Sequence, residues 1–490
     1  MKVNVEAQLS PMFRILSDDQ LYEIHLASLE VLERVGVKVD EPEARKLLKD
    51  AGALIDEKSN VCKIPSDIVQ SAINSAPPRV VLADRDGKRC MYLEKNNPYF
   101  GTGSDLHYVI DPYTGERRSN SKQDIENTTR VVDYLPNIDF MMSMGIAKDK
   151  PASVSDLHQF EAMVNNTSKP LLITAHHRQS LLDQIEMAAM VRGGLANLQA
   201  NPLFSLYTEP VSPLCHSYDG LQKLMSCAEY RIPVNYTPGL CGGGTGPVTR
   251  AGAFVTANAE SLSALTIHQL KRKGSPFIYG GVATILDMKS TVFSYAAPEM
   301  HIGSAVLTQL SKMYELPMFS TAGCSDSNVF DEQAALESSY TIFLAALSGA
   351  NLIHDVGYVE SGLTCSYEML VVSDEIIDMV RHMLNNFAVN TNTMALDVIE
   401  KVGPGGQYVT NEHTFANFKE EMWFPKLLNR NRHDSWEQSG SMTLSMKANE
   451  KARDILENYQ SSKLPEKVQE EISTLISKRL ESYESRQLHS

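Results

Sequence analysis

Short apolar segments alternate with amphipathic stretches through most of this chain. Eight segments have the length and composition of buried strands, and a stretch with helical spacing of its apolar residues follows each of them. The strand segments span 97–102, 138–145, 170–175, 202–208, 232–238, 276–281, 317–323 and 351–357. The helical stretches span 121–134, 155–166, 178–191, 217–230, 248–273, 298–315, 330–348 and 367–385. Eight strand–helix units predict an α/β protein built on a (β/α)8 TIM barrel, and a doubly wound open sheet remains the alternative.

The two ends of the chain depart from this rhythm. Residues 1–95 combine an amphipathic helix with short β-like pieces, which predicts a small N-terminal α+β cap domain. Beyond the barrel, expected over 96–386, a Gly/Pro loop at 403–406 leads to a charged helical tail. We therefore expect a C-terminal helical extension over 387–490, packed on the outside of the barrel or against a second subunit.

Six apolar segments carry Tyr or Phe near their C-terminal ends. They are NPYFGTG (97–103), LFSLYTEP (203–210), VNYTPG (234–239), PFIYGG (276–281), PMFSTAG (317–323) and LIHDVGY (352–358). A parallel barrel gathers the C-terminal ends of its strands around one pocket. Aromatic faces in such a pocket suit a cation without hydrogen-bond donors, such as a quaternary ammonium. Aromatic residues are also common in strands for structural reasons, and strand alternation turns some outward, so we expect three or four of the six to reach the pocket.

Ionisable residues also stand at predicted strand ends. His354 and Asp355 close the eighth strand, where the histidine would either contact a substrate or be a core residue bonded to the backbone. Glu209 ends the fourth strand on the same face as Tyr207, where it would complete a cation site, cap a helix or pair with an arginine. In the pair His176–His177, which ends the third strand, at most one side chain faces the pocket.

The loop GLCGGGTGPVTR after the fifth strand is the most glycine-dense part of the chain. Gly246–Pro247 is expected to open the next helix, with proline at its first position. Backbone N–H groups there would hold an anion such as a carboxylate, or the loop would simply be a tight turn. It carries neither a Walker sequence nor a GxGxxG fingerprint.

Composition removes several classes of function. The net charge of −15 argues against a nucleic-acid binder, which needs a basic surface. Seven scattered cysteines without a CxxC pair, together with the absence of a signal-like N-terminus or a long apolar run, predict a cytoplasmic protein that does not enter a membrane. Cys324, His354 and Cys365 lie near the last two strand ends and are zinc-ligand types, but the tight spacing of metal sites is missing, so we expect no metal.

Longer stretches resemble one known family. They include LEVLERVGV, DAGALID, IPSDIV, APPRVVLADRDG, YFGTGSD, GGVATILDMKSTVFSYAAPE, AGCSDSNVFDEQAALE, NLIHDVGYVESGLTCSYEMLVVSDEI and VGPGGQYVTNEHTFANFKEEMWFPKLLNR. In this order and over the whole length, the chain resembles the trimethylamine methyltransferase superfamily, in particular its members without pyrrolysine that demethylate quaternary amines.

The resemblance implies a TIM barrel that passes a methyl group from a methylamine to the Co(I) corrinoid of a separate small protein. In the archaeal trimethylamine enzymes a pyrrolysine sits in the barrel, and its counterpart here falls in the loop 325–333, which holds only ordinary residues, Asn328, Val329 and Phe330 among them. This departure favours a betaine-type quaternary amine (glycine betaine, proline betaine, carnitine or γ-butyrobetaine) over trimethylamine. A quaternary ammonium already carries a neutral amine as leaving group and needs no unusual electrophile.

On this interpretation, six aromatic side chains would bind the cation, and two polar side chains would contact the substrate as catalytic residues. The cation set is Phe100, Tyr207, Tyr236, Tyr279, Tyr295 and Tyr358, and the polar pair is His354 and Glu209. A substrate carboxylate would be held by His354, by Arg250 or by backbone N–H groups of the Gly-rich loop.

The resemblance also implies no tightly bound cofactor, because the cognate corrinoid protein supplies the corrinoid (cobalamin). A homo-oligomer working in the one-carbon metabolism of methanogenesis or acetogenesis is expected. Two alternatives remain: a Zn-dependent corrinoid methyltransferase of the methanol or methylthiol type, and a non-catalytic quaternary-amine sensor.

Overall fold

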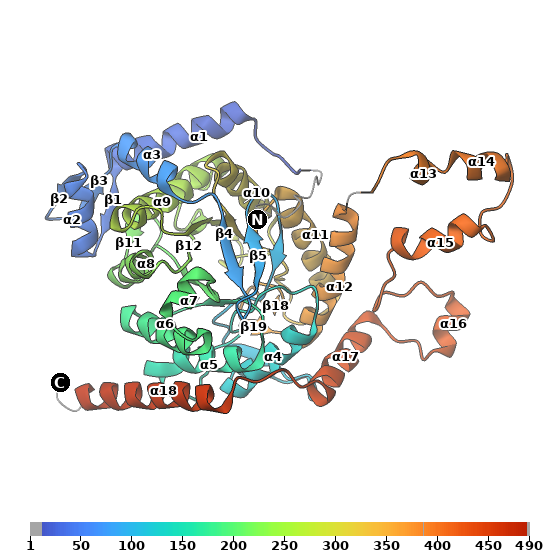
Figure 1. Ribbon diagram of the computed structural model, residues 1–490. Coiled ribbons are helices and arrows are strands. Elements are labelled where there is room, and N and C mark those ends of the chain that lie inside the picture. The colour runs from blue at the N-terminus through green and yellow to red at the C-terminus, as the bar shows by residue number, and fades with distance from the viewer. Residues whose placement is uncertain (1–11, 386, 488–490) are drawn as a thin grey trace.

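A parallel β-barrel surrounded by helices forms the centre of the molecule (Figure 1). The computed structural model describes residues 12–385 and 387–487. Seven parallel strands pair in the order β6–β17–β16–β14–β12–β10–β9. Their bounds are β6 (Tyr99–Phe100), β9 (Leu171–Ile173), β10 (Phe204–Thr208), β12 (Val234–Tyr236), β14 (Phe277–Gly280), β16 (Met318–Thr321) and β17 (Leu352–His354).

The eighth strand position is taken by residues around Phe140 and Met141. Parallel bridges join Gly101 to Phe140 on one side and Met141 to Leu171 on the other. These bridges connect β6 to β9 and close the sheet into a ring. The predicted (β/α)8 barrel is therefore confirmed, and the open doubly wound sheet is wrong.

Every expected helix of the barrel is present. The bounds are α4 (Lys122–Tyr134), α5 (Ser155–Asn166), α6 (Arg178–Arg192), α8 (Tyr218–Tyr230), α9 (Arg250–Lys271), α10 (Pro298–Met313), α11 (Glu332–Ser348) and α12 (Tyr367–Leu384). Local sequence explains several starts: Ser121, Ser217 and Ser366 cap their helices with a side-chain oxygen. One start differs from expectation, because α9 begins at Arg250 and not at Gly246–Pro247. The short helix α7 (Leu195–Ala200) follows α6.

Strand alternation divides the core into two layers. One apolar cluster fills the space between the barrel and its helices and includes Leu206, Val234 and Phe277. A second cluster fills the barrel interior and includes Phe140, Leu172, Ile278, Phe319 and Leu352. Burial on both faces explains why these strands are mostly apolar and lack the regular polar alternation of a half-exposed strand.

The N-terminal segment packs along the barrel and also enters it. It comprises α1 (Asp18–Glu30), a π-helical turn (Val31–Val35), β1 (Val37–Val39), α2 (Pro42–Asp50), β2 (Leu54–Asp56), β3 (Val61–Lys63), α3 (Ser66–Ser75), β4 (Val80–Ala83) and β5 (Arg89–Leu93). The sheet β1–β3–β2 adds β11 (Cys215–His216), which lies between β10 and α8. This pairing ties the segment to the barrel, and the expected boundary at residue 95 stays a prediction.

The β4–β5 hairpin closes one end of the barrel. Leu82 and Met91 of the hairpin belong to the same apolar cluster as Leu172 and Leu352 inside the barrel. Asn351, just before β17, donates its side-chain N–H groups to backbone carbonyls that directly follow the hairpin. The closed end is the one where the strands begin, opposite the strand C-termini.

Loops after the strands build the other end, which we call the mouth. β13 (Gly239–Gly242) and β15 (Val282–Ile285) continue the chain beyond β12 and β14 as a separate parallel pair. A second sheet in the order β18–β19–β7–β8 lies over the mouth, formed by β7 (Tyr108–Ile110), β8 (Arg117–Ser119), β18 (Tyr358–Val359) and β19 (Thr364–Cys365).

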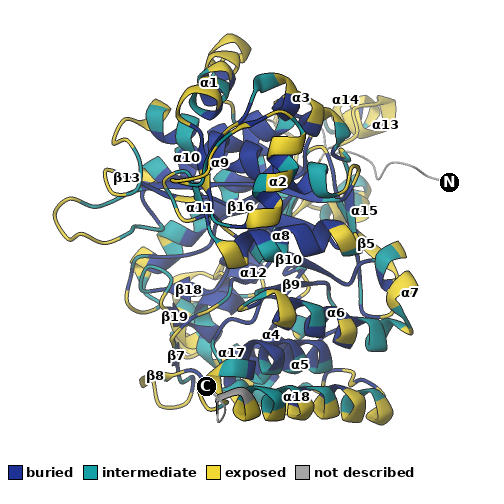
Figure 2. Ribbon diagram, turned by 90° about the vertical axis from the view of Figure 1, so that its left-hand side faces the viewer, coloured by how far each residue is buried: buried dark blue, intermediate teal, exposed yellow. Residues whose placement is uncertain are grey.

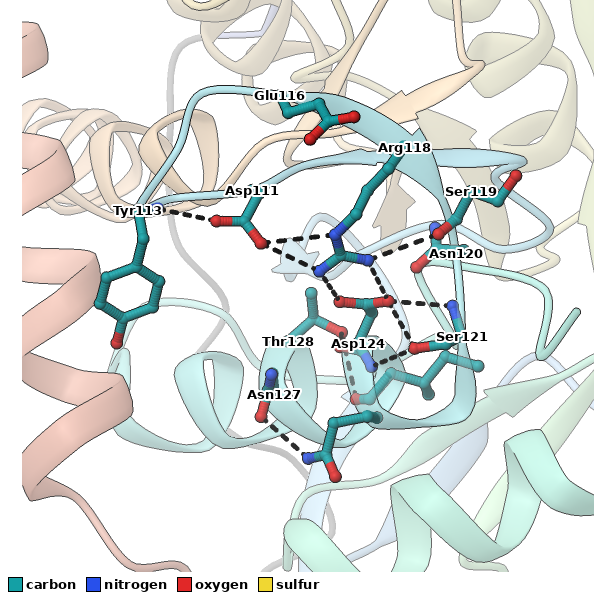
Figure 3. Close-up of polar contacts among 12 residues, drawn as sticks. Asp111, Tyr113, Glu116, Arg118, Ser119, Asn120, Ser121, Asp124, Asn127 and Thr128 are labelled. Atoms are coloured by element: carbon teal, nitrogen blue, oxygen red, sulfur yellow. Dashed lines mark hydrogen bonds and ion pairs between the residues drawn. The ribbon is translucent and has the colours of Figure 1, made fainter. Parts of the chain in front are cut away.

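A partly buried ion cluster fixes this sheet to α4 (Figure 3). The Arg118 guanidinium lies 2.7 Å from an Asp124 carboxylate oxygen and 3.2 Å from one of Asp111. Asp124 also accepts hydrogen bonds from the backbone and hydroxyl of Ser121, the residue that caps α4. The β7–β8 hairpin is thus held at a set distance from the barrel.

The C-terminal segment contains both packed and projecting helices. These are α13 (Thr391–Met394), α14 (Leu396–Val402), α15 (Glu412–Glu421), α16 (His433–Gln438), α17 (Leu444–Asn458) and α18 (Glu466–Gln487). α17 packs against α12 and α4, and α18 packs against α5 and α6. α13, α14 and α15 extend away from the barrel (Figure 1). Within the described residues, no helix is both long enough and apolar enough to cross a membrane.

Candidate functional site

Side chains from three different strand ends converge at the mouth. Tyr207 lies on β10, and its hydroxyl donates a 2.9 Å hydrogen bond to Glu209. The Tyr207 ring lies 5.6 Å from the Phe319 ring and 6.1 Å from the His354 ring, centre to centre. Phe319 stands on β16 and His354 ends the neighbouring β17, whereas β12 and β14 separate β10 from β16, so the Tyr207 ring reaches the other two across the barrel. The C-terminal ends of the strands thus meet in one aromatic and polar cluster.

Asp355 and Tyr358 approach the same point from the segment after β17. The Tyr358 hydroxyl donates a 2.7 Å hydrogen bond to the carbonyl of Ser104, which follows β6. A Cβ atom at Gly103 would lie 2.1 Å from the Tyr358 hydroxyl oxygen and 2.4 Å from an Asp355 carboxylate oxygen. Only glycine at position 103 lets these two side chains close against the end of β6.

His354 is oriented by contacts on both ring nitrogens. Nδ1 lies 2.9 Å from the carbonyl oxygen of Ser320, and Nε2 lies 3.1 Å from Asp355 Oδ1. A carbonyl can only accept, so Nδ1 carries a hydrogen, and a hydrogen bond between Nε2 and Asp355 requires a further hydrogen on one of these two groups. Thr321 donates a 2.6 Å hydrogen bond to the other Asp355 oxygen. The ring plane of His354 is therefore fixed, with the Phe319 ring 4.2 Å away.

Three carboxyl groups share this region, and burial raises the pKa of each. They are Asp105, Glu209 and Asp355. The hydrogen bond from Tyr207 opposes the rise in the pKa of Glu209, whereas the nearby Asp105 adds to it. Asp105 and Glu209 are nevertheless accessible to solvent. Because both carboxyl groups are accessible and yet desolvated, we infer that they border a hollow at the mouth and do not lie on the outer surface.

Positive charge near the three carboxyl groups is limited. Lys223 and His176 lie close enough to lower the pKa of Glu209 and Asp105 respectively. Burial lowers the pKa of Lys223 itself, and its ammonium group donates a 2.8 Å hydrogen bond to the carbonyl of Ala175. The hollow is therefore rich in negative charge, a property that attracts cations.

Tyr295 completes the aromatic lining from the loop after β15. Its backbone N–H donates a 2.9 Å hydrogen bond to Asp326, which also accepts one of 2.9 Å from the Ser361 hydroxyl. Glu337 of α11 accepts the backbone N–H of Asp326 at 2.9 Å. The loop 325–333 therefore has a structural task, which is to hold Tyr295 and the segment after β17 in place.

The expected cation set divides into two halves. Tyr207, Tyr295 and Tyr358 meet at the mouth together with Glu209 and His354. Phe100, Tyr236 and Tyr279 instead face the helices that surround the barrel, and the Arg381 guanidinium of α12 lies 5.8 Å from the centre of the Phe100 ring. The Tyr236 hydroxyl pairs with His216 at 2.7 Å, and the Tyr279 hydroxyl donates to Asn258 of α9 at 2.8 Å. Strand alternation is the reason, because residues on the same strand at odd spacing face opposite sides.

Two groups at the mouth are absent from the residues proposed on sequence grounds. Asp105 follows β6 after a Gly–Thr–Gly run, and the signal available for it is a carboxylate a few residues beyond a strand end. Phe319 lies in one of the six aromatic segments, and its inward direction follows from the register of β16 with β17. Asp355 joins the site together with its neighbour His354.

The Gly-rich loop after β12 is folded onto itself. The backbone N–H groups of Gly244, Thr245 and Gly246 all point to the carbonyl of Cys241, at 2.8–3.1 Å. These donors are already used, so the tight turn describes the loop better than an anion site does. Arg250 is exposed at the first position of α9. Of the three groups expected to hold a carboxylate, His354 is the one within the cluster.

The remaining candidate ligands do not gather around one point. His176 lies 3.0 Å from the hydroxyl of Ser155, and His177 caps α6. Cys324 and Cys365 are buried on either side of Tyr358, Cys324 through an isolated bridge and Cys365 as part of β19. Within the described part of the chain, no group of three or more His, Cys, Asp and Glu side chains is arranged to hold a metal ion.

Comparison with known proteins identifies the family. The sequence profile of the trimethylamine methyltransferase (MTTB) family matches residues 2–484. The chain belongs to this family. The trimethylamine methyltransferase MttB of Desulfitobacterium hafniense is 35% identical over 467 residues, covering 95% of this chain and 94% of that protein.

Two further relatives are named for different substrates, trimethylamine and glycine betaine. MttB of Methanosarcina barkeri (strain Fusaro) is 32% identical over 475 residues, with 95% and 94% coverage. The glycine betaine methyltransferase of D. hafniense strain Y51 is 29% identical over 476 residues, with 96% and 98% coverage. The protein is therefore a methyltransferase.

A solved structure supports the fold of this methyltransferase. The monomethylamine methyltransferase MtmB of M. barkeri superposes with a TM-score of 0.54 at 13% sequence identity, covering 91% of this chain and 88% of that one. At this low identity the match bears on the architecture alone, which agrees with the closed barrel described above.

Proposed function

We propose that the enzyme transfers a methyl group from a quaternary amine of betaine type to the Co(I) corrinoid of a separate protein. The observation that carries the proposal is the lining of the hollow, where Tyr207, Tyr295 and Tyr358 stand beside the carboxyl groups of Glu209 and Asp105. The hydroxyls of Tyr207 and Tyr358 already donate to protein oxygens. What remains for a ligand is ring faces and negative charge, which suits a cation that has no N–H to donate.

Catalysis in this site consists mainly of positioning. Each ring face contributes about 0.5–2 kcal/mol of attraction to the cation. One N–CH3 bond breaks, its electron pair stays on nitrogen, and a neutral tertiary amine leaves. When bound, the corrinoid supplies the nucleophile. The side chains hold the ammonium group, exclude water and direct one N-methyl group toward the opening of the barrel.

Apolar side chains on the loops after strands β13 to β17 suit a large, largely apolar macrocycle. The exposed set is Val248, Met288, Val292, Val329 and Leu363. All five lie on segments that connect a strand end to the next helix, which is the face where the hollow opens. A corrinoid ring that approached this rim would bring its metal to the N-methyl group without entering the barrel.

The family supports a substrate that carries N-methyl groups, and the loop 325–333 supports a quaternary one. This loop contains only ordinary residues, and Asp326 is occupied in holding Tyr295 and Ser361. A relative named glycine betaine methyltransferase matches almost the whole chain. For a betaine, a contact between the carboxylate and His354 would require Nε2 to exchange its Asp355 partner, because Nδ1 already donates to the Ser320 carbonyl.

An anaerobic methyl-transfer assay tests the proposal. Purified enzyme is mixed with Co(I) cobalamin and, one at a time, glycine betaine, proline betaine, carnitine, γ-butyrobetaine, tetramethylammonium and trimethylamine. We expect methyl-Co(III) absorbance to grow with at least one quaternary amine and not with trimethylamine. Methyl transfer from trimethylamine alone, or from none of the panel, would refute the proposal.

A further inference from the structure

The C-terminal segment contains an exposed limb, which we define as residues 387–422. It leaves the body at the end of α12, carries α13, α14 and α15, and extends well away from the barrel (Figure 1). None of these three helices has a buried residue. Within 387–422 only the small side chain of Ala395 is buried. The limb therefore has no hydrophobic core of its own.

Large apolar side chains nevertheless cover the limb. Val409 is 85% exposed, Phe415 82% and Phe387 78%, and the further exposed members are Val389, Met394, Leu396, Ile399, Tyr408 and Met422. Monomeric proteins rarely leave such a concentration of apolar surface in water, and where it occurs it marks an interaction site. The helices of the limb are also short, and isolated helices under about 12–15 residues are marginal in water. Both facts indicate an interaction site, at which an external surface covers the limb.

The limb is held firmly at its root. Glu375 of α12 accepts hydrogen bonds from the backbone N–H groups of Lys426, Leu427 and Leu428 at 2.9–3.2 Å. The indole N–H of Trp423 donates to Asp378, also of α12, at 3.1 Å. Because α12 anchors the chain on both sides of the limb, the limb is presented in a defined direction and does not behave as a free tail.

The direction of the limb decides which partner it fits. In Figure 2 the mouth elements β13 and β18 lie at the left, whereas α13 and α14 lie at the right, on the side of β5, whose hairpin closes the other end of the barrel. A protein that delivers a reactant to the mouth would not meet the limb of the same chain. A second copy of this chain carries its own limb and can exchange it in a symmetric, self-complementary way.

We propose that the limb, residues 387–422, packs against a second copy of this chain and forms the main contact of a homodimer. Its length agrees with this role, since one side of a stable interface uses about 20–30 residues. Two exchanged limbs bury the apolar side chains of both copies at once. The body of each copy keeps its mouth open, because the contact lies toward the opposite end.

Analytical ultracentrifugation of the full chain, without substrate, tests the proposal independently of the methyl-transfer activity. We expect the wild type to sediment as a dimer or a multiple of it at micromolar concentration. The variant Leu396→Glu/Val409→Glu/Phe415→Glu should weaken self-association about 100-fold or more. The matched control is Leu54→Glu, because Leu54 is 71% exposed on β2, outside the limb. This control should sediment like the wild type, and circular dichroism should show native helix content for both variants.

Hydrogen exchange provides a second measurement that does not depend on substitutions. Amides of the limb should exchange slowly in the assembled protein and rapidly after dilution below the dissociation constant. A monomeric wild type, equal dissociation of the Leu54→Glu control, or an undisturbed assembly in the triple limb variant would overturn the proposal. So would limb amides that become protected only when a corrinoid protein is added.

Discussion

Tyr207 and Tyr279 are both strand tyrosines of the same barrel, yet they face opposite surroundings. The Tyr207 hydroxyl donates to the carboxylate of Glu209 at the edge of the hollow. The Tyr279 hydroxyl donates to Asn258 in the layer between barrel and helices. Glu209 and Glu260 offer a second comparison, because burial raises the pKa of both carboxyl groups. Glu260 of α9, however, accepts hydrogen bonds from the Ser212 hydroxyl and the Leu214 backbone N–H.

The comparison shows that residue type alone does not define this site. A tyrosine or a buried carboxyl group can contact a ligand only where strand direction turns its side chain into the mouth. On the outer face the same groups join the helices to the barrel and contribute to stability. The following substitutions separate these two situations.

The largest effect is expected from Glu209→Gln. Removal of the negative charge beside a bound cation in a desolvated site costs about 1.5–3 kcal/mol, so kcat/KM for the quaternary amine should fall about 10–100-fold. Glu260→Gln is the matched control, since it alters a buried carboxyl group on the outer layer, and its kcat/KM should equal that of the wild type. Steady-state methylation of Co(I) cobalamin measures both. Equal losses in the two variants would remove the distinction between the faces.

A smaller effect is expected from Tyr207→Leu. Loss of one aromatic face should weaken binding of tetramethylammonium about 10-fold, within the range of a cation–π contact. Tyr207→Phe keeps the ring and should bind nearly as well as the wild type. Tyr279→Phe should leave affinity unchanged. Isothermal titration calorimetry on the four proteins decides the matter, and unchanged affinity in Tyr207→Leu would exclude this ring from the cation site.

The pH dependence of cation binding should be weaker still, on the order of several-fold. Burial raises the pKa of Glu209 above its ordinary value of 4.5 and that of Asp105 above 3.8. A cation favours the ionised carboxylates, so affinity for tetramethylammonium should increase as pH rises through these raised values and level off above them. The basic groups Lys223, His176 and His354 face the same region, and loss of positive charge from a basic group as pH rises acts in the same direction. Asp105→Asn should flatten the profile, and an affinity that decreases with pH would contradict the assignment.

The smallest effect is expected from Tyr236→Phe, on the outer face. The substitution leaves His216 Nδ1 without its 2.7 Å partner, which should lower the free energy of unfolding by about 1 kcal/mol. Methyl transfer should stay at the wild-type rate. Thermal denaturation and the cobalamin assay together measure this, and a selective loss of activity would move Tyr236 into the site.

Most of the architecture follows from periodicity, because a barrel strand buried on both faces leaves a continuous apolar sequence between amphipathic helices. The facing of individual aromatics does not follow so simply. In VNYTPG, polarity alone would turn Asn235 outward and Tyr236 inward, but Asn235 lies inside the barrel, bonded to Ser205. A polar pair inside the barrel reverses the assignment, and no local pattern in the sequence reports it.

Other features depend on contacts that are distant in sequence. The convergence of Asp105, Glu209 and Asp355 requires three separate strand ends to be placed first. The Gly-rich loop contains the composition of an anion site, but its N–H groups bond to the loop's own carbonyl of Cys241. Composition cannot distinguish these two outcomes, because both need the same backbone freedom of glycine.

The β4–β5 hairpin, which closes the end of the barrel where the strands begin, has a kinetic consequence. With β4 and β5 inserted there, the amine, the demethylated product and the corrinoid must all use the same opening. For the proposed reaction this imposes a compulsory order, in which the amine enters before the corrinoid protein docks and the product leaves after it departs. Premature docking on the empty enzyme would form a dead-end complex, so the rate should pass through a maximum as the concentration of the corrinoid protein increases.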